Sequence, residues 1–341
     1  MKQLIAKTAI LPVIMLIILF GINACSSVKP LSIDVLKPAG VTIPANIKSV
    51  KVINQSNIVN NGKLSVQLNL LTKDEMPPDI DSTVSSQFVA GFYNYMSYSP
   101  RFEMKPPLYR PMYSNRTALQ KLNPLMVQYI CDTANCDGLV TIDYFRLTDS
   151  IDAYRTDQGY YAYLDLYNKS LWRFYSGKTG EIVDEYYLND TIFWDNTSYD
   201  QYSVFSNFPT PVEAAQQSAF SAGTSYASRI APEWITVNRF YYDISISGIK
   251  ETRQLIANNQ WEQAISIWKT LLNGENVKLA SKAAFNIAIA WEVNDNLEKA
   301  LSWAEKSNAL YSRNSTLNYI KLLKKRIADK AKLEQQLPVE K

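Results

Sequence analysis

Apolar and polar side chains alternate in several segments of the first two thirds of the chain, and this period of two predicts strands. Segment 66–70 alternates in this way, and the apolar residues Ile47, Val50 and Val52 mark another strand. Turn-forming residues at 60–62 favour a hairpin between the two. Farther along, Gly138–Leu147 is almost continuously apolar. We interpret it as a strand buried on both faces.

A longer hairpin is predicted where two aromatic-rich segments, 160–175 and 181–194, flank the sequence Ser176–Gly180. The two glycines of that sequence permit the positive φ angles that tight turns need. The same five residues contain Gly-Lys-Thr, but they lack the upstream glycine and the following helix of a phosphate-binding loop. We therefore expect a turn there and no nucleotide site.

Apolar residues also recur at helical spacing. Val84–Tyr95 shows this period, with Asp81 placed to cap the helix, and a second helix is expected from Asn123 to about Cys131, because asparagine followed by proline favours a helix start. A third helix is predicted over Pro211–Ile230. Its first turn has a capping box formed by Thr210 and Glu213, and four small residues would let it lie close on a sheet: Ala215, Ala219, Gly223 and Ala227.

The last third of the chain has helical periodicity throughout. Trp261–Ile265 is echoed by Leu297–Leu301, 36 residues later. This spacing, with Ile287, Ala288 and Trp291 between, resembles the tetratricopeptide repeat, whose period is about 34 residues. A polar helix over 314–337 would then cap the repeats. We therefore expect an α+β domain over 41–243, with helices covering at least one face of a sheet, and an all-α tetratricopeptide-like domain over 244–341.

The N-terminus has the pattern of an export signal. Lys2 and Lys7 precede an apolar run that is shorter than the roughly 20 residues of a membrane span. The run ends at Ile22-Asn23-Ala24-Cys25, which resembles a lipobox. The resemblance implies removal of residues 1–24, lipid on Cys25, and a tether over 25–40. An ordinary signal cut near Ala24, leaving a free thiol, is the alternative.

The lipid-anchored form implies a location. Ser26 occupies the position after the cysteine, where an aspartate retains lipoproteins at an inner membrane. No acidic cluster that resembles a surface-export tag follows Cys25. By this resemblance we expect the outer membrane, with the body facing the periplasm. Two or three acyl chains would hold the protein firmly, since each buried methylene contributes about 0.8 kcal/mol.

Charge argues against a nucleic-acid partner. Removing residues 1–24 takes away Lys2 and Lys7 and no acid, which lowers the formal net charge from +3 to +1. Binding to phosphates needs a basic stripe. The basic residues near the C-terminus are interpreted as a solvated helix face; they are Lys321, Lys324, Lys325, Arg326, Lys330 and Lys332.

Two cysteines, Cys131 and Cys136, follow Cys25. In an oxidising compartment they could form a local disulfide, and two buried thiols are the equal alternative. Because the chain contains no histidine and no second cysteine pair, we expect no zinc site. No signature predicts any other metal or cofactor.

No motif predicts catalysis. The absence of histidine excludes the Ser-His-Asp and Cys-His arrangements, and Ser247–Lys250 matches Ser-x-x-Lys by letters alone. Carboxylates crowd the strand region, where they are expected to face solvent: Asp143, Asp149, Asp152, Asp165, Glu181, Asp184, Glu185, Asp190 and Asp195. Aromatic residues share it, either as sheet packing or as a binding platform: Tyr160, Tyr161, Tyr163, Tyr167, Trp172, Tyr175, Tyr186, Tyr187 and Trp194.

The lipobox, followed by Asp34–Ala39, Ile43-Pro44 and Ile47–Val50, resembles an uncharacterised family of Bacteroidetes lipoproteins over nearly the whole chain. That resemblance implies an envelope location and no chemistry. We expect a non-enzymatic adaptor or assembly factor that binds a protein partner in the cell envelope through its helical repeats. The alternative is a periplasmic glycan-binding or glycan-processing protein that uses the tyrosine-rich sheet. The sequence leaves the oligomeric state open.

Overall fold

The computed structural model describes residues 28–56, 59–60, 63–64, 66–68, 77–109, 120–244 and 251–337. These residues form two compact units. The sheet unit comprises Leu36–Trp234 together with the residues from Lys330 onward. The helical unit comprises Ile235–Asp329 together with the residues up to Val35. Residues 1–24 and Cys25, which carry the predicted signal and lipid site, lie outside the described residues.

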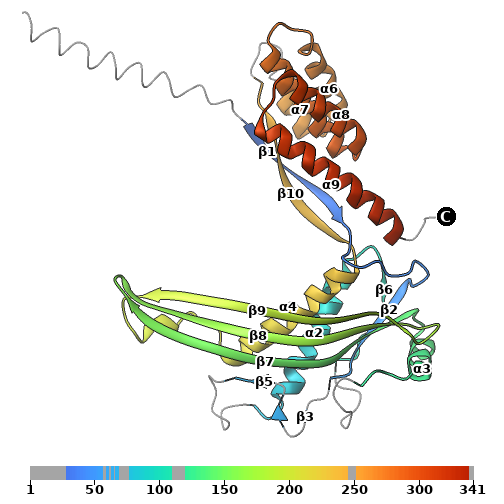
Figure 1. Cartoon of the computed structure of the whole chain (residues 1–341), viewed down its shortest axis with the longest axis vertical. Coiled ribbons are helices and arrows are strands. Elements are labelled where there is room, and N and C mark those ends of the chain that lie inside the picture. Colours follow the sequence, from blue (N-terminus) through green and yellow to red (C-terminus); the bar gives the residue numbers. More distant parts are fainter. Residues whose placement is uncertain are drawn as a thin grey trace, which may run out of the picture. The chain divides into compact units, whose positions relative to one another are not determined.

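The sheet unit is built on one mixed sheet. Its strands are β2 (Ser49–Asn54), β5 (Val66–Gln67), β6 (Glu103–Met104), β7 (Gly138–Thr156), β8 (Gly159–Ser176) and β9 (Ile182–Ser198). The strand order is β6-β2-β7-β8-β9, and β5 pairs with β7 beside this path. β2 is parallel to β6 and β7, whereas β7, β8 and β9 are antiparallel neighbours. Figure 1 shows these three long strands running side by side.

The predicted long hairpin is confirmed as β8 and β9. Gly180 has a φ of +74° in the turn between them, and Gly159 has a φ of +129° in the turn that joins β7 to β8. Glycine adopts such angles without steric cost. The buried strand expected at Gly138–Leu147 is also present, but β7 continues to Thr156, so the ladder is longer than predicted.

The hairpin expected between segments 47–52 and 66–70 is wrong. β2 pairs with β6 and β7, and β5 pairs in parallel with β7 through Val66 and Leu147. The reason is the length of β7: β2 reaches only as far as Ile142 on it, which leaves a later stretch free to pair with β5. Two short strands near the expected turn, β3 (Val59–Asn60) and β4 (Lys63–Leu64), pair with each other instead.

Two helices, α2 (Ile80–Ser97) and α4 (Pro211–Ile230), pack together and cover one face of the sheet (Figure 1). They cross at glycines. A Cβ on Gly223 would lie 2.1 Å from the carbonyl oxygen of Phe88, and one on Gly91 would lie 2.0 Å from that of Phe220. The small residues predicted for closeness to a sheet therefore also bring α4 against α2.

Two of the three predicted helix starts are confirmed. Thr210 and Glu213 form the expected capping box, and the Asn123 side chain accepts from the N–H of Leu125 at the start of α3 (Pro124–Ala134). The role expected of Asp81 is wrong, because it lies in the first turn of α2 and accepts from the N–H of Val66 at 2.9 Å. It thereby joins α2 to β5.

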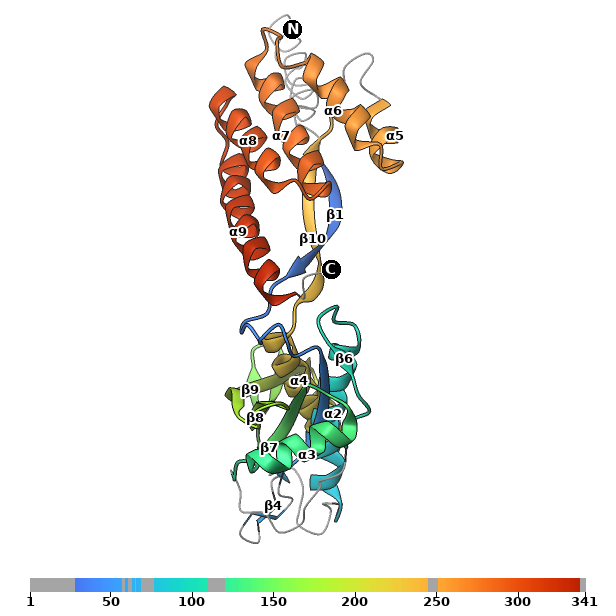
Figure 2. The same ribbon diagram turned by 90° about the vertical axis from the view of Figure 1, so that its right-hand side faces the viewer.

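The helical unit contains α5 (Glu251–Ala257), α6 (Trp261–Thr270), α7 (Val277–Val293), α8 (Leu297–Leu310) and α9, whose full range is Asn314–Gln336. α7 packs along α8 and also contacts α6, which in turn contacts α5. Trp268, Phe285, Ile287 and Leu323 are fully buried in one core. Figure 2 shows α7 and α8 running side by side. The predicted helical C-terminal region is therefore confirmed. No helix within the described ranges is long and apolar enough to cross a membrane.

The structure adds two strands that we did not predict, β1 (Val28–Lys37) and β10 (Glu233–Tyr242), which pair with each other. Residues 28–37 were assigned to a tether. They form a strand instead, because Leu31, Ile33 and Val35 alternate with exposed polar residues and the partner strand alternates in the same way.

Candidate functional site

The surface of the helical unit holds an extended strand of the same chain. Asn286 of α7 accepts from the backbone N–H of Tyr242 at 2.7 Å and donates to its carbonyl oxygen at 2.8 Å. Beside this clamp, Phe240 stacks on Phe285 with ring centroids 5.1 Å apart. We call residues 239–242 the held strand. These two hydrogen bonds between the Asn286 amide and the Tyr242 backbone do not depend on the side chain of residue 242.

The held strand begins at a buried ionic cluster. Glu292, whose side chain is 0% exposed, accepts from Arg239 of β10, and from Arg326 and Tyr319 of α9 at 2.6 and 2.8 Å. Burial raises the pKa of Glu292, but the hydrogen bonds and charges of the two arginines and of Tyr319 outweigh it and hold that pKa below its ordinary value. The carboxylate therefore stays ionised.

The held strand ends beside three cations. Lys282 of α7 and Arg313, just before α9, each lie 5.4 Å from the ring centroid of Tyr242. Arg313 also lies 4.7 Å from the ring of Tyr311, and Lys278 approaches that ring at 5.2 Å. We call Lys278, Lys282 and Arg313 the basic cluster.

A second candidate surface lies on the sheet face opposite α2 and α4, which we call the outer face. The cross-strand register places Tyr154 of β7 opposite Tyr161 of β8, with ring centroids 5.3 Å apart. The next row on the same face contains Asp152, Tyr163 and Asp195 from β7, β8 and β9. Phe193 and Tyr187 of β9 follow on this face and are more than half exposed. Aromatic rings and carboxylates thus alternate over an exposed part of the outer face.

The predicted aromatic set divides between the two interpretations. Trp172 is fully buried and stacks on Tyr226 at 4.9 Å, and Tyr186 also stacks on Tyr226 at 6.3 Å. Tyr175 is buried under α3, and Trp194 packs against the core on the covered face. The members that belong to the outer face are Tyr161, Tyr163, Tyr167 and Tyr187.

The predicted carboxylates divide in a similar way. Asp143 and Glu185 both pair with Arg173, whose side chain is 3% exposed, and Asp184 binds Tyr226 and Arg229. Asp149 is also buried. The expectation that these acids face solvent is therefore wrong for three of them, because Asp143, Asp149 and Asp184 are buried. Glu185 is exposed, as expected, although it also pairs with Arg173. Asp152, Asp165 and Asp195 stand on the outer face.

The cysteine pair lies at the end of α3. Both cysteines are free thiols, Cys131 buried and Cys136 half-buried, and the two are hydrogen-bonded. That hydrogen bond lowers the pKa of Cys136 and, with burial, raises that of Cys131. A Cβ on Gly177 would lie 2.9 Å from the sulfur of Cys131, so the hairpin turn packs on this thiol. A disulfide between the cysteines stays a prediction.

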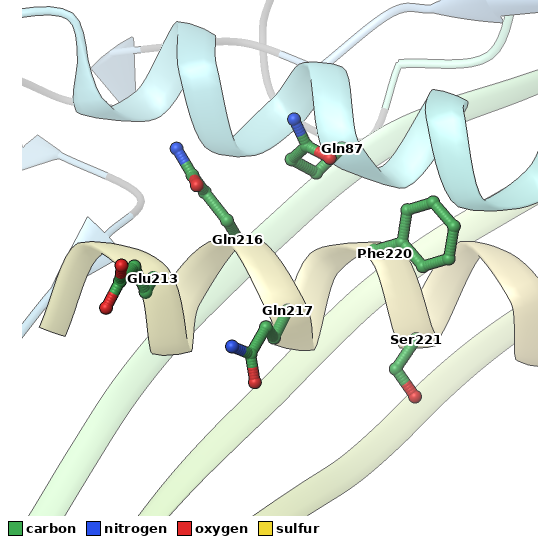
Figure 3. Close-up of a pocket in the computed structure, with 6 residues that line it drawn as sticks. All are labelled: Gln87, Glu213, Gln216, Gln217, Phe220 and Ser221. Atoms are coloured by element: carbon green, nitrogen blue, oxygen red, sulfur yellow. The ribbon is translucent and has the colours of Figure 1, made fainter. Parts of the chain in front are cut away.

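One depression is formed by the helices that cover the sheet. It is lined by Gln87 of α2 and by α4 residues Glu213, Gln216, Gln217, Phe220 and Ser221 (Figure 3). Its one carboxylate, Glu213, is engaged by the backbone and hydroxyl of Thr210. The depression therefore offers amide groups and a ring but no reactive group. No group of residues that could hold a metal ion occurs in the part of the chain that the structure describes.

Sequence reasoning missed the held strand and the basic cluster. The basic residues of α9, which we had interpreted as a solvated helix face, include Arg326 of the Glu292 cluster and Lys324, which lies 3.5 Å from Glu305. The available signal was the spacing of Lys278 and Lys282, which puts both on one side of a helix. Arg313 could not be joined to them from sequence, because it follows a different helix.

Three solved structures resemble the chain at low similarity. They are the PelC dodecamer from Paraburkholderia phytofirmans (9% identity, TM-score 0.26, covering 59% of this chain and 98% of that one), a putative neuraminyllactose-binding hemagglutinin homolog from Helicobacter pylori (7%, 0.29, 55% and 89%) and the hypothetical protein CT253 from Chlamydia trachomatis (9%, 0.22, 53% and 96%). At these TM-scores the likenesses carry no argument about function. No curated protein matches the chain.

Two family models match, and both describe domains without an assigned function. The second, Domain of unknown function (DUF6340), matches residues 250–325, which lie in the helical unit. The first matches residues 47–242, more than half of the chain. The chain therefore belongs to the family described as Domain of unknown function (DUF8603).

Proposed function

We propose that this chain is a non-enzymatic lipoprotein of the outer membrane that binds a protein partner in the cell envelope through its helical unit. In this proposal residues 1–24 are removed, lipid on Cys25 anchors the protein, and the body faces the periplasm. The helix pairs of the helical unit act as tetratricopeptide-like repeats, in a family of Bacteroidetes lipoproteins.

The observation that carries the proposal is the held strand. The helical unit grips extended backbone through Asn286 and packs the side chains of the strand on Phe285. Main-chain hydrogen bonds and side-chain contacts of this kind are the interactions by which proteins bind extended peptides. Around the end of this strand the surface continues with exposed apolar residues, Val277 at 52% and Leu317 at 40%. They leave contact area for a second chain.

The partner can be tested by crosslinking in intact cells, with capture through a C-terminal tag and mass spectrometry. We compare the unchanged full chain with a Val277→Asp, Leu317→Asp variant, which changes only exposed side chains of the helical unit. A matched variant, Tyr187→Ser with Phe193→Ser, changes exposed residues of the sheet unit. The proposal expects an envelope protein to be captured by the unchanged chain and the matched variant, and lost from the first variant. Capture that both variants retain would overturn it.

The anchor is tested separately by replacing Cys25. Cys25→Ala should abolish labelling of the chain by palmitate and move it from the outer-membrane fraction to the soluble periplasmic fraction. The reason is that the acyl chains on Cys25 supply the membrane attachment. Cys136→Ala is the matched control and should keep both label and location. A chain that stays labelled without Cys25 would disprove this assignment.

A second candidate function is glycan binding by the outer face. The row of Asp152, Tyr163 and Asp195 favours it, because rings stack on the apolar face of a sugar while flanking carboxylates accept from its hydroxyls. On a glycan array the Tyr187→Ser, Phe193→Ser variant should then lose binding that the Val277→Asp, Leu317→Asp variant keeps. This pattern is the reverse of the one expected for partner capture.

A further inference from the structure

The basic cluster brings three positive charges together without a compensating carboxylate. Lys282 and Arg313 share the ring of Tyr242, and Lys278 and Arg313 share the ring of Tyr311. Within the described part of the chain, none of the three takes part in an ion pair. Asp243, which directly follows the held strand, pairs with Arg253, and residues 245–250 contain no aspartate or glutamate.

The cluster is fixed in place by neutral groups. Arg313 donates to the hydroxyl of Ser281 at 2.7 Å and to the carbonyl oxygen of Lys278 at 3.1 Å. These bonds position the guanidinium between the two tyrosine rings and leave its charge uncompensated. Burial, and then the charge of Arg313, lower the pKa of Lys282. Like charges held this close repel one another, and a bound anion would relieve the repulsion.

The surroundings indicate what kind of anion fits. The held strand runs to Tyr242, where the basic cluster begins, so the surface that takes extended backbone and the cations adjoin. Val277, next to Lys278, and Leu317, one helical turn after Arg313, add exposed apolar area. A simple ion would use only the charges, whereas a peptide would use charges, rings and apolar residues together.

We propose that the basic cluster binds an acidic peptide segment of the partner, with its carboxylates on Lys278, Lys282 and Arg313. The proposal rests on the function proposed above and names the chemistry of the partner. The rings of Tyr242 and Tyr311 lie against these three cations. Electrostatic attraction of this kind speeds association and selects among partners.

The test measures fluorescence anisotropy of a labelled peptide that alternates glutamate and alanine, added to the purified full-length chain in detergent. The matched probe has glutamine in place of glutamate. We expect binding of the acidic probe only, weakened about fivefold by Lys278→Gln or by Lys282→Gln, and more by both, since one exposed charge pair contributes a factor of this size. Raising the salt concentration should weaken it further.

Lys325→Gln is the matched control variant. Lys325 is exposed on α9, about 18 Å from Arg313 along the helix axis, so its substitution should not change the affinity for the probe. Thermal unfolding should be the same for all lysine variants. No binding of the acidic probe, equal binding of the glutamine probe, or equal weakening by Lys325→Gln would each overturn the proposal. Stronger competition by a single-stranded oligonucleotide or by anionic vesicles would overturn it in favour of another anion.

The two proposals fail in different ways. If cells show a partner that depends on Val277 and Leu317 but the acidic probe does not bind, the charge assignment fails and the adaptor function stands. If the probe binds through Lys278 and Lys282 but partner capture is unaffected by the Val277→Asp, Leu317→Asp variant, the adaptor function fails and the cluster is an anion site of another purpose.

Discussion

Each unit contains a buried carboxylate that accepts hydrogen bonds from both arginine and tyrosine, Glu292 in the helical unit and Asp184 in the sheet unit, and the two sites differ in what they join. In the helical unit, the Glu292 side chain is 0% exposed and accepts hydrogen bonds from Arg239, Arg326 and Tyr319. In the sheet unit, Asp184 of β9 receives Tyr226 and Arg229, both from α4, and Arg229 remains 30% exposed. Glu292 therefore connects three elements that are distant in sequence, whereas Asp184 connects two.

The difference follows from what else holds each unit together. The sheet unit has long antiparallel ladders and a close crossing of α2 and α4. The packing of α4 therefore fixes its position even without the hydrogen bonds to Asp184. In the helical unit, β10 reaches α7 through side chains rather than through a ladder. A buried ionic cluster there fixes the position of a strand that nothing regular pairs with on that side. We expect the helical unit to be the more sensitive to loss of one carboxylate.

Glu292→Ala should have the largest effect. Removing the carboxylate leaves Arg239, which is 9% exposed, without its partner, and breaking a buried ion pair on one side costs about 3–5 kcal/mol. Hydrogen exchange followed by mass spectrometry, read separately for peptides of each unit, measures the loss. Exchange should accelerate in α7, α9 and β10 and stay unchanged in β7–β9. Glu305→Ala is the control, because its pair with Lys324 is exposed on both sides and contributes at most about 1 kcal/mol.

Gly223→Ala tests the claim that packing fixes α4. The new methyl group would meet the carbonyl oxygen of Phe88 at 2.1 Å, a backbone atom that cannot move aside locally. Overpacking of this kind costs about 1–3 kcal/mol, and urea denaturation should show it. Gly274→Ala is the matched glycine, with its nearest contact at 3.7 Å and no positive φ. It should be neutral or slightly stabilising. Equal effects at the two glycines would remove packing as the explanation.

Asp184→Asn should have a smaller effect than either of these changes. The amide keeps the shape of the side chain and can still accept from Tyr226, but it loses the charge that pairs with Arg229, which is 30% exposed. We expect a loss of about 1–2 kcal/mol, measured by the same urea experiment. A loss as large as that of Glu292→Ala would mean that the two sites are equivalent. It would also mean that the strand ladders do not make the sheet unit less dependent on its carboxylate.

The features that were predictable from sequence are those set by neighbours along the chain. The capping box of Thr210 and Glu213, the Asn123 cap and the glycine turn of β8 and β9 depend on residues a few positions apart. The pairing of β1 with β10 joins Ser32 to Asn238, about two hundred residues away, and no local pattern specifies such a partner. The β-branched run Ile235–Val237 was a signal for β10 that we did not use.

The faces of the sheet were harder to assign than its strands. Alternation gives each strand two faces, but a register shift between Ile142 and Tyr144 exchanges them within β7. Val140 and Ile142 face the core before the shift, and Phe145 and Leu147 face it afterwards. Asp143 stands at the shift, where it pairs with Arg173. Which carboxylates and rings share the outer face therefore depends on one bulge that the sequence does not announce.

The smallest effect, and the most selective, is expected from acid. Burial raises the pKa of Glu292, but Arg239, Arg326 and Tyr319 lower it by a larger amount, so the pKa lies below the ordinary value. The unfolded chain therefore takes up this proton at a higher pH than the folded chain does. The stability that Glu292 supplies is fully present above its unfolded pKa of about 4.3 and is lost as the pH falls through the folded value.

Acid also protonates carboxylates of the sheet unit whose pKa values are lowered, including Glu185 and Glu233, and it therefore weakens that unit in the same direction. Glu292→Gln separates its contribution, because glutamine cannot be protonated in this range. In hydrogen exchange corrected for the intrinsic effect of pH, the variant should start less stable in α7 and α9, and its acid dependence there should be shallower than that of the unchanged chain. The acid dependence of β7–β9 should not change. If α7 and α9 keep the same slope in both proteins, the ionised Glu292 is not what distinguishes the helical unit from the sheet unit.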